Sequence, residues 1–116
     1  MTRKRVVLAA VSDLHIGSTV ALCPPGGIVL EDGGRYEPNP AQAWIWDQWL
    51  KFRDAIAACK RSGWKVILIM NGEFIDGRHH DSTQLASASP EIMASAAIDA
   101  MMPMVKACDT LYATRG

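Results

Sequence analysis

The chain has no excess of charge of either sign, because twelve Lys and Arg residues balance twelve Asp and Glu residues among 116 residues. This balance excludes a broad basic surface of the kind that holds DNA or an anionic membrane, but not a local site. Cysteine is scarce, and Cys23, Cys59 and Cys108 have no close spacing. The sequence therefore predicts neither a disulfide framework nor a zinc knuckle, and it favours a reducing compartment.

Long apolar runs are also missing. The first apolar run, residues 6–11, is six residues long before Ser12 and Asp13 end it, which is shorter than the core of a secretory signal. No stretch approaches the ~18 apolar residues that are needed to cross a bilayer. We therefore expect a soluble, cytoplasmic protein that has no membrane contact.

Apolar residues nevertheless make up 49% of the chain, enough for the core of a single small domain over residues 1–116. They gather in three widely spaced runs, residues 6–11, 66–70 and 111–114. The first run is continuous rather than alternating, which is typical of a parallel strand buried on both faces. The second is rich in β-branched residues, which favour strands. We expect three strands.

Helix signals occupy the intervals between these runs. Asn39-Pro40 and Ser89-Pro90 each combine an N-cap residue with proline at the first helical position, where a missing N–H costs nothing. The expected helices span residues 40–62 and 90–107, and Gly63 suits the left-handed position after the first helix. This alternation of strands and helices predicts an α/β fold with a parallel sheet and right-handed crossovers.

A long loop, residues 17–38, interrupts this pattern after the first strand. Within it, Ile28-Val29-Leu30 and Arg35-Tyr36 flank a glycine turn, which predicts a small hairpin. A long loop that directly follows the carboxyl end of a strand is functional more often than neutral.

Ligands of open parallel sheets gather beyond the carboxyl ends of the strands. Asp13 and His15 follow the first strand, and Glu73 follows the second. Side chains two positions apart in an extended segment point the same way, so Asp13 and His15 can reach one ion. A carboxylate oxygen with an imidazole nitrogen suits Mn, Fe or Zn better than Mg or Ca. Glu73 could supply a third ligand and bridge two cations.

Two motifs resemble a known family. Ser12-Asp13-Leu14-His15 and Asn71-Gly72-Glu73-Phe74-Ile75-Asp76-Gly77 resemble the calcineurin-like metallophosphoesterases, whose signature begins Asp-x-His and continues Gly-Asp-x-x-Asp. The resemblance covers nearly the whole chain as an N-terminal portion. It implies the first half of an α/β sandwich with parallel strands, crossover helices and a long loop or hairpin after the first strand. Residues 77–84 and Thr114-Arg115-Gly116 look most like phage-associated members, which implies a phage or prophage origin.

The resemblance implies a metal site and a reaction. Asp13 and His15 would ligate the first of two divalent ions, with Mn, Fe or Zn favoured, and Glu73 stands where the family has a bridging aspartate. Such a pair of ions activates water for hydrolysis of a phosphomonoester or phosphodiester. The substrate could be a small phosphoester, a nucleotide or a nucleic acid.

Three further residues are candidates for the catalytic machinery. By the resemblance, Asp76 would be a supporting acid near the metals, although a loop residue that bonds its own backbone is an equal alternative. His79 and His80 could contact the phosphate or a metal from a loop over the site. Exposed loop histidines without a function are equally common.

The sequence departs from the family in ways that keep other functions open. Glu73 is one methylene longer than aspartate, while metal–oxygen distances tolerate only a few tenths of an ångström. The remaining ligands are expected beyond Gly116, so these residues alone should bind metal weakly and turn over little substrate. A noncatalytic remnant or binding module is the alternative. A nucleotide-binding α/β domain is disfavoured because no glycine-rich phosphate loop follows the first strand.

Overall fold

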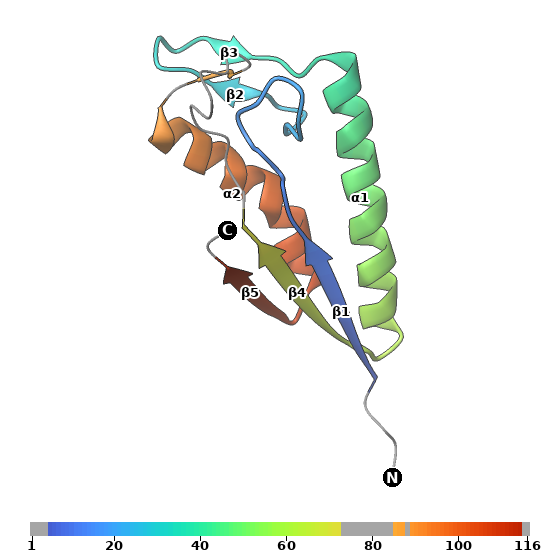
Figure 1. Ribbon diagram of the computed structural model, residues 1–116. Helices are drawn as coiled ribbons and strands as arrows, with labels where there is room; N and C mark the ends of the chain where they lie inside the picture. The colour runs from blue at the N-terminus through green and yellow to red at the C-terminus, as the bar shows by residue number, and fades with distance from the viewer. Residues whose placement is uncertain (1–4, 73–84, 88, 115–116) are drawn as a thin grey trace.

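The computed structural model describes residues 5–72, 85–87 and 89–114. These residues form strands and helices in alternation, with a small hairpin after the first strand (Figure 1). In chain order the elements are β1 (Val6–Val11), β2 (Ile28–Val29), β3 (Arg35–Tyr36), α1 (Pro40–Arg61), β4 (Lys65–Asn71), α2 (Pro90–Ala107) and β5 (Thr110–Thr114). The three expected strands, both helices and the hairpin are confirmed, and so is the α/β class.

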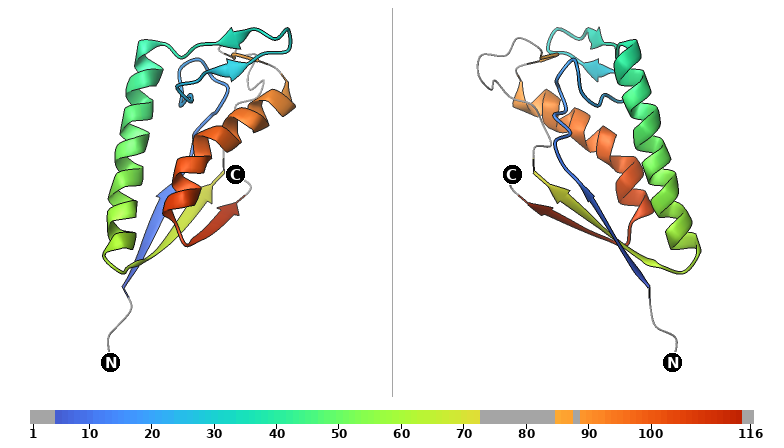
Figure 2. Two further views of the ribbon diagram at one scale, coloured as in Figure 1. Left: turned by 180° about the vertical axis from the view of Figure 1, so that it is seen from behind. Right: turned by 45° about the vertical axis from the view of Figure 1, so that its right-hand side comes forward.

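The main sheet has the order β1-β4-β5, and both neighbouring pairs are parallel, as predicted. The register pairs Val11 with Met70 and Met70 with Ala113, so the carboxyl ends of all three strands reach the same edge. Both crossovers step in the same direction across the sheet. Right-handed crossovers of this kind place their helices on one face, and Figure 2 shows α1 and α2 on the same side.

The core lies between this face of the sheet and the two helices. Val66, Leu68 and Met70 of the central strand are almost completely buried there. The helices also contact each other, because the Trp49 indole N–H of α1 donates a 2.8 Å hydrogen bond to the Ala100 carbonyl of α2. The sheet and both helices therefore form a two-layer unit that fixes the direction in which β1 leaves the sheet.

The opposite face of the sheet is not covered by the described residues. Leu8 is 65% exposed and Tyr112 is 59% exposed, while Ile67 and Ile69 between them are half-buried. The prediction that β1 is buried on both faces is therefore wrong for the described part of the chain. The run in β1 is continuous because apolar residues occupy both faces of the strand, although the two helices cover only one face of the sheet.

The helix ends follow the sequence signals. Asn39 caps α1 by accepting a 3.0 Å hydrogen bond from the Gln42 backbone N–H, and Ser89 caps α2 by accepting from Ile92. Gly63 follows α1 with a φ of 88°, the left-handed conformation that the sequence predicted for it. Among the described residues, no helix is long and apolar enough to cross a membrane.

Candidate metal centre

The candidate site begins where β1 ends. Beyond Val11 the chain leaves the sheet, and Asp13 and His15 adopt left-handed backbone conformations with φ values of 57° and 46°. Leu14 between them is buried, whereas both flanking side chains reach solvent. The expectation of an extended segment is therefore wrong. Two left-handed residues separated by a buried leucine bring the side chains together instead.

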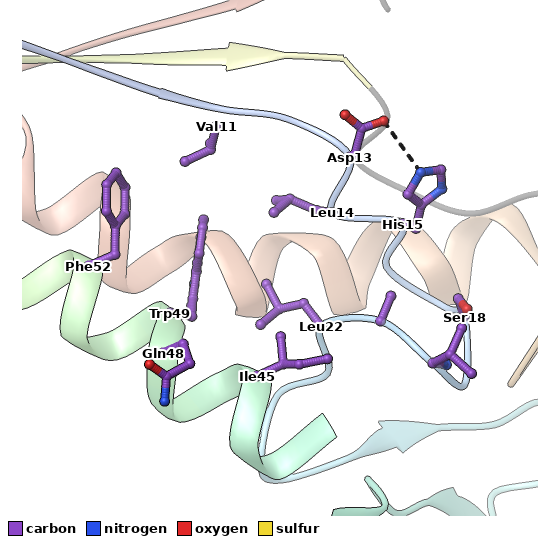
Figure 3. Close-up of a pocket in the computed structure, with 12 residues that line it drawn as sticks. Val11, Asp13, Leu14, His15, Ser18, Leu22, Ile45, Gln48, Trp49 and Phe52 are labelled. Carbon is purple, nitrogen blue, oxygen red and sulfur yellow. Dashed lines mark hydrogen bonds and ion pairs between the residues drawn. The ribbon is translucent and has the colours of Figure 1, made fainter. Parts of the chain in front are cut away.

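Asp13 and His15 do face each other. Asp13 Oδ1 lies 3.6 Å from His15 Nε2, and Figure 3 shows the two side chains turned toward one another. The other carboxylate oxygen, Asp13 Oδ2, accepts a 2.8 Å hydrogen bond from Ser12 Oγ. The Ser12 hydroxyl thus restrains the Asp13 carboxylate at Oδ2, while Oδ1 of the same carboxylate faces the His15 imidazole.

This geometry suits two ligands of one ion. Ligand atoms about 2.1 Å from a metal lie roughly 3.0–3.5 Å from each other in tetrahedral or octahedral shells. The separation of 3.6 Å between Asp13 Oδ1 and His15 Nε2 is close to that range. A carboxylate and an imidazole together match the preferences of Mn, Fe and Zn. The pair fits half of a metal shell.

The other predicted site residues, Glu73, Asp76, His79 and His80, lie outside the described residues. Within residues 5–72, 85–87 and 89–114, no group of three or more His, Cys, Asp and Glu side chains is placed to hold a metal ion. The described strand ends beside the candidate site are linked by Thr114 Oγ1, which donates a 2.8 Å hydrogen bond to Asn71 Oδ1.

The loop that carries the site is attached to the rest of the fold at several points. Ile16 is completely buried, and the Gly17 carbonyl accepts a 2.8 Å hydrogen bond from the Ala86 backbone N–H. Ser18 forms a β-bridge with Leu85. These contacts hold the segment that follows His15 against the residues that precede α2.

Gln42 of α1 ties the same loop to the helix, a role that our interpretation of the sequence missed. Its side chain is fully buried, and Nε2 donates to the carbonyls of Ser18 at 3.0 Å and Ala21 at 2.9 Å. Its Oε1 accepts from Tyr36 Oη at 2.7 Å and from the Asn39 N–H at 3.2 Å. The spacing Asn39-x-x-Gln42 is the signature of a capping box and could have indicated part of this role.

Cys23 lies in the same loop but takes no part in the site. Burial, with a smaller contribution from the Glu37 carboxylate, raises the pKa of the Cys23 thiol to about 11. A thiol with such a pKa is neutral at physiological pH, whereas metal ligation and nucleophilic attack need the thiolate. Cys23 is therefore a buried packing residue.

None of the family models, curated proteins and solved structures compared with this chain matches it. The resemblance to the calcineurin-like metallophosphoesterases thus stays a prediction. It depends on the motifs around Asp13 and Glu73, and the described residues add the paired geometry of Asp13 and His15.

Proposed function

We propose that this chain forms part of a metal-dependent phosphoester hydrolase in which Asp13 and His15 ligate the first of two divalent ions. The observation that carries the proposal is the 3.6 Å approach of Asp13 Oδ1 to His15 Nε2 beyond the carboxyl end of β1. That edge is where ligands of open parallel sheets bind. The sequence motif and the geometry lead to the same two residues.

Backbone strain supports a functional role for the pair. Asp13 and His15 are the only residues other than glycine with positive φ in the described part of the chain. Aspartate and histidine adopt this conformation more readily than most residues, but it still costs about 1 kcal/mol or more for each. Such strain collects at functional sites, because the surrounding fold must hold it in place.

Each residue has a defined task in this proposal. Asp13 Oδ1 and His15 Nε2 bind the first ion, and Ser12 Oγ orients the carboxylate through its 2.8 Å hydrogen bond. Glu73 is the proposed bridging carboxylate. When bound, the ions provide positive charge for the phosphoryl oxygens and a reactive water.

The flanking candidates have weaker support. Asp76 is proposed as a supporting acid near the ions, and His79 and His80 as groups that contact the phosphate. These roles come from the sequence motif alone, since all three residues lie outside the described ranges.

Metal binding provides the direct test. Mn²⁺ binding, followed by electron paramagnetic resonance, should weaken at least about tenfold in Asp13→Asn, because the neutral amide is a poor metal ligand. Asp47→Asn, which removes an exposed carboxylate from α1, is the matched control and should bind like the wild type. Equal Mn²⁺ affinity in the wild type and in Asp13→Asn would contradict the proposal.

Turnover separates a hydrolase from the alternative, a noncatalytic binding module. The binding module stays an alternative because the described residues contain no group of three or more side chains placed to hold a metal ion. In a protein that also contains the ligands expected beyond Gly116, hydrolysis of bis(p-nitrophenyl) phosphate with Mn²⁺ should be lost in Asp13→Asn and retained in Asp47→Asn. Glu73→Asp should change the number of ions bound or the rate if this carboxylate bridges two ions. Mn²⁺ binding without hydrolysis in that longer protein would favour the binding module.

A further inference from the structure

A pocket of about 750 Å³ opens between the loop that follows β1 and the first half of α1. Its walls are mainly apolar, and Figure 3 shows side chains from the loop and from the helix directed into the space between them. The apolar lining residues are chiefly Val11, Leu14, Leu22, Ile45, Trp49 and Phe52. The volume lies in the range of pockets that bind small organic molecules.

The aromatic wall offers ring surface rather than hydrogen bonds. The Trp49 indole N–H is already engaged with the Ala100 carbonyl at 2.8 Å. The rings of Trp49 and Phe52 stack with their centroids 6.3 Å apart and their planes at 26°. A ligand in contact with this wall is therefore held by the burial of apolar surface.

The charge of its lining residues distinguishes this pocket from a binding site for anions. None of its described lining residues is Lys or Arg, so these residues offer no cation to a phosphate or to a nucleic-acid backbone. Its charged group is the Asp13 carboxylate, which lines the pocket together with His15. The apolar pocket and the candidate metal ligands are thus continuous.

We propose that this pocket binds the apolar organic group of a phosphoester, an alkyl or aryl chain, while its phosphoryl group lies at Asp13 and His15. This inference rests on the proposed function and narrows its substrate class. Asp13 and His15 at the rim would hold the ion that binds the phosphoryl group, and Leu14 and Trp49 line the part of the pocket that would receive the organic group. The described lining favours an apolar organic group over a nucleic-acid backbone, because it carries no basic residue to meet a polyanion.

The length of the ligand's alkyl chain is the variable that tests the pocket. Methyl, butyl and octyl phosphonates carry the same head group and cannot be hydrolysed. Each additional buried methylene should tighten binding by up to about fourfold. We expect at least about a tenfold gain in affinity from methyl to butyl phosphonate, measured by titration calorimetry with Mn²⁺ present and again with EDTA.

Three variants locate the effect. Ile45→Glu places a carboxylate in the apolar wall and should abolish the gain in affinity with chain length. Trp44→Glu makes a similar change at the preceding, 64% exposed position of α1 outside the pocket, and should leave the gain intact. Gln48→Trp, at a half-buried lining position, should fill the pocket and remove the gain even if Ile45→Glu fails to fold.

The outcomes distinguish this inference from the proposed function. Equal affinity for all chain lengths, or an unchanged gain in Gln48→Trp, would overturn the pocket assignment even if Mn²⁺-dependent hydrolysis is found. A gain that persists in EDTA and is lost in Gln48→Trp, together with no Mn²⁺-dependent hydrolysis of bis(p-nitrophenyl) phosphate by a protein that contains the ligands expected beyond Gly116, would support the pocket and refute the hydrolase.

Discussion

Gln42 is the residue whose replacement tests most directly how the fold holds the candidate site. Its buried amide makes four hydrogen bonds, two donated to the loop after His15 and two accepted from the hairpin and the helix N-cap. Gln42→Met keeps the length of the side chain and removes all four. The helix itself should persist, because methionine is a good helix former.

The cost can be worked out from the burial of each partner. The Ser18 carbonyl loses its partner in a buried setting, which costs about 1–3 kcal/mol. The Ala21 carbonyl and the Tyr36 hydroxyl are part-buried and should lose about 0.5–1.5 kcal/mol each. The exposed Asn39 N–H can bond to water instead. The free energy of unfolding should therefore fall by about 4 kcal/mol, which lowers Tm by about 15 °C in a domain of this size.

Thermal unfolding followed by circular dichroism measures this change, and Gln48→Met is the matched control. Gln48 lies on the same helix and is half-buried, and its side chain makes no hydrogen bond to the described part of the chain. Its replacement should change the free energy of unfolding by less than about 0.5 kcal/mol. If both variants lose the same stability, or if Gln42→Met loses less than about 1 kcal/mol, the attachment of the loop does not depend on this amide.

Two further predictions concern the backbone and pH. Gly27→Ala should destabilise the fold by at least about 2 kcal/mol, since its φ is 79° and the new Cβ would overlap the carbonyl oxygen of Tyr36 in β3. Gly33→Ala, with φ 82° and open space around the Cβ, should cost only about 1 kcal/mol in chemical denaturation. A hydrogen bond from the Val66 N–H, and secondarily the nearby Lys60 ammonium, lower the pKa of Asp109, so this carboxylate stabilises the fold at neutral pH and loses its contribution as the pH falls below about 4. The Tm advantage of the wild type over Asp109→Asn should therefore be larger at pH 7 than at pH 3.

Each of these predictions has a clear contrary result. Equal losses of stability in Gly27→Ala and Gly33→Ala would show that β3 shifts to accommodate the methyl group. A Tm difference between the wild type and Asp109→Asn that is the same at pH 7 and pH 3 would show that the charge of this carboxylate contributes nothing to stability.

Local sequence signals were sufficient to predict the helices and strands and their order along the chain. The caps at Asn39 and Ser89 and the glycine at position 63 act within one turn of the chain, so the sequence alone located both helices to within a residue or two. The parallel sheet followed from the alternation of strands and helices. Burial could not be predicted in the same way, because it depends on which side of the sheet the two crossovers place their helices.

The candidate site was predicted in identity but not in conformation. The residue pattern selected Asp13 and His15, and they do approach each other, yet through left-handed backbone rather than an extended segment. Leu14 is buried between the two left-handed residues, and no local sequence pattern predicts that turn. The pocket was missed because Ile45, Trp49 and Phe52 form an ordinary apolar helix stripe, and the loop path that leaves space beside them depends on contacts distant in sequence.

The face of the sheet that the described residues leave open has a practical consequence for every measurement on this chain. Leu8 pairs with Ile67 there, and Tyr112 pairs with Ile69, two residues further along the central strand on the same face. Apolar surface of this kind associates in water with any apolar surface that it meets, including that of another molecule of the same protein. Melting temperatures and dissociation constants then vary with protein concentration. A dilution series thus belongs in each of these assays, and the values extrapolated to low concentration are those that report on the fold itself.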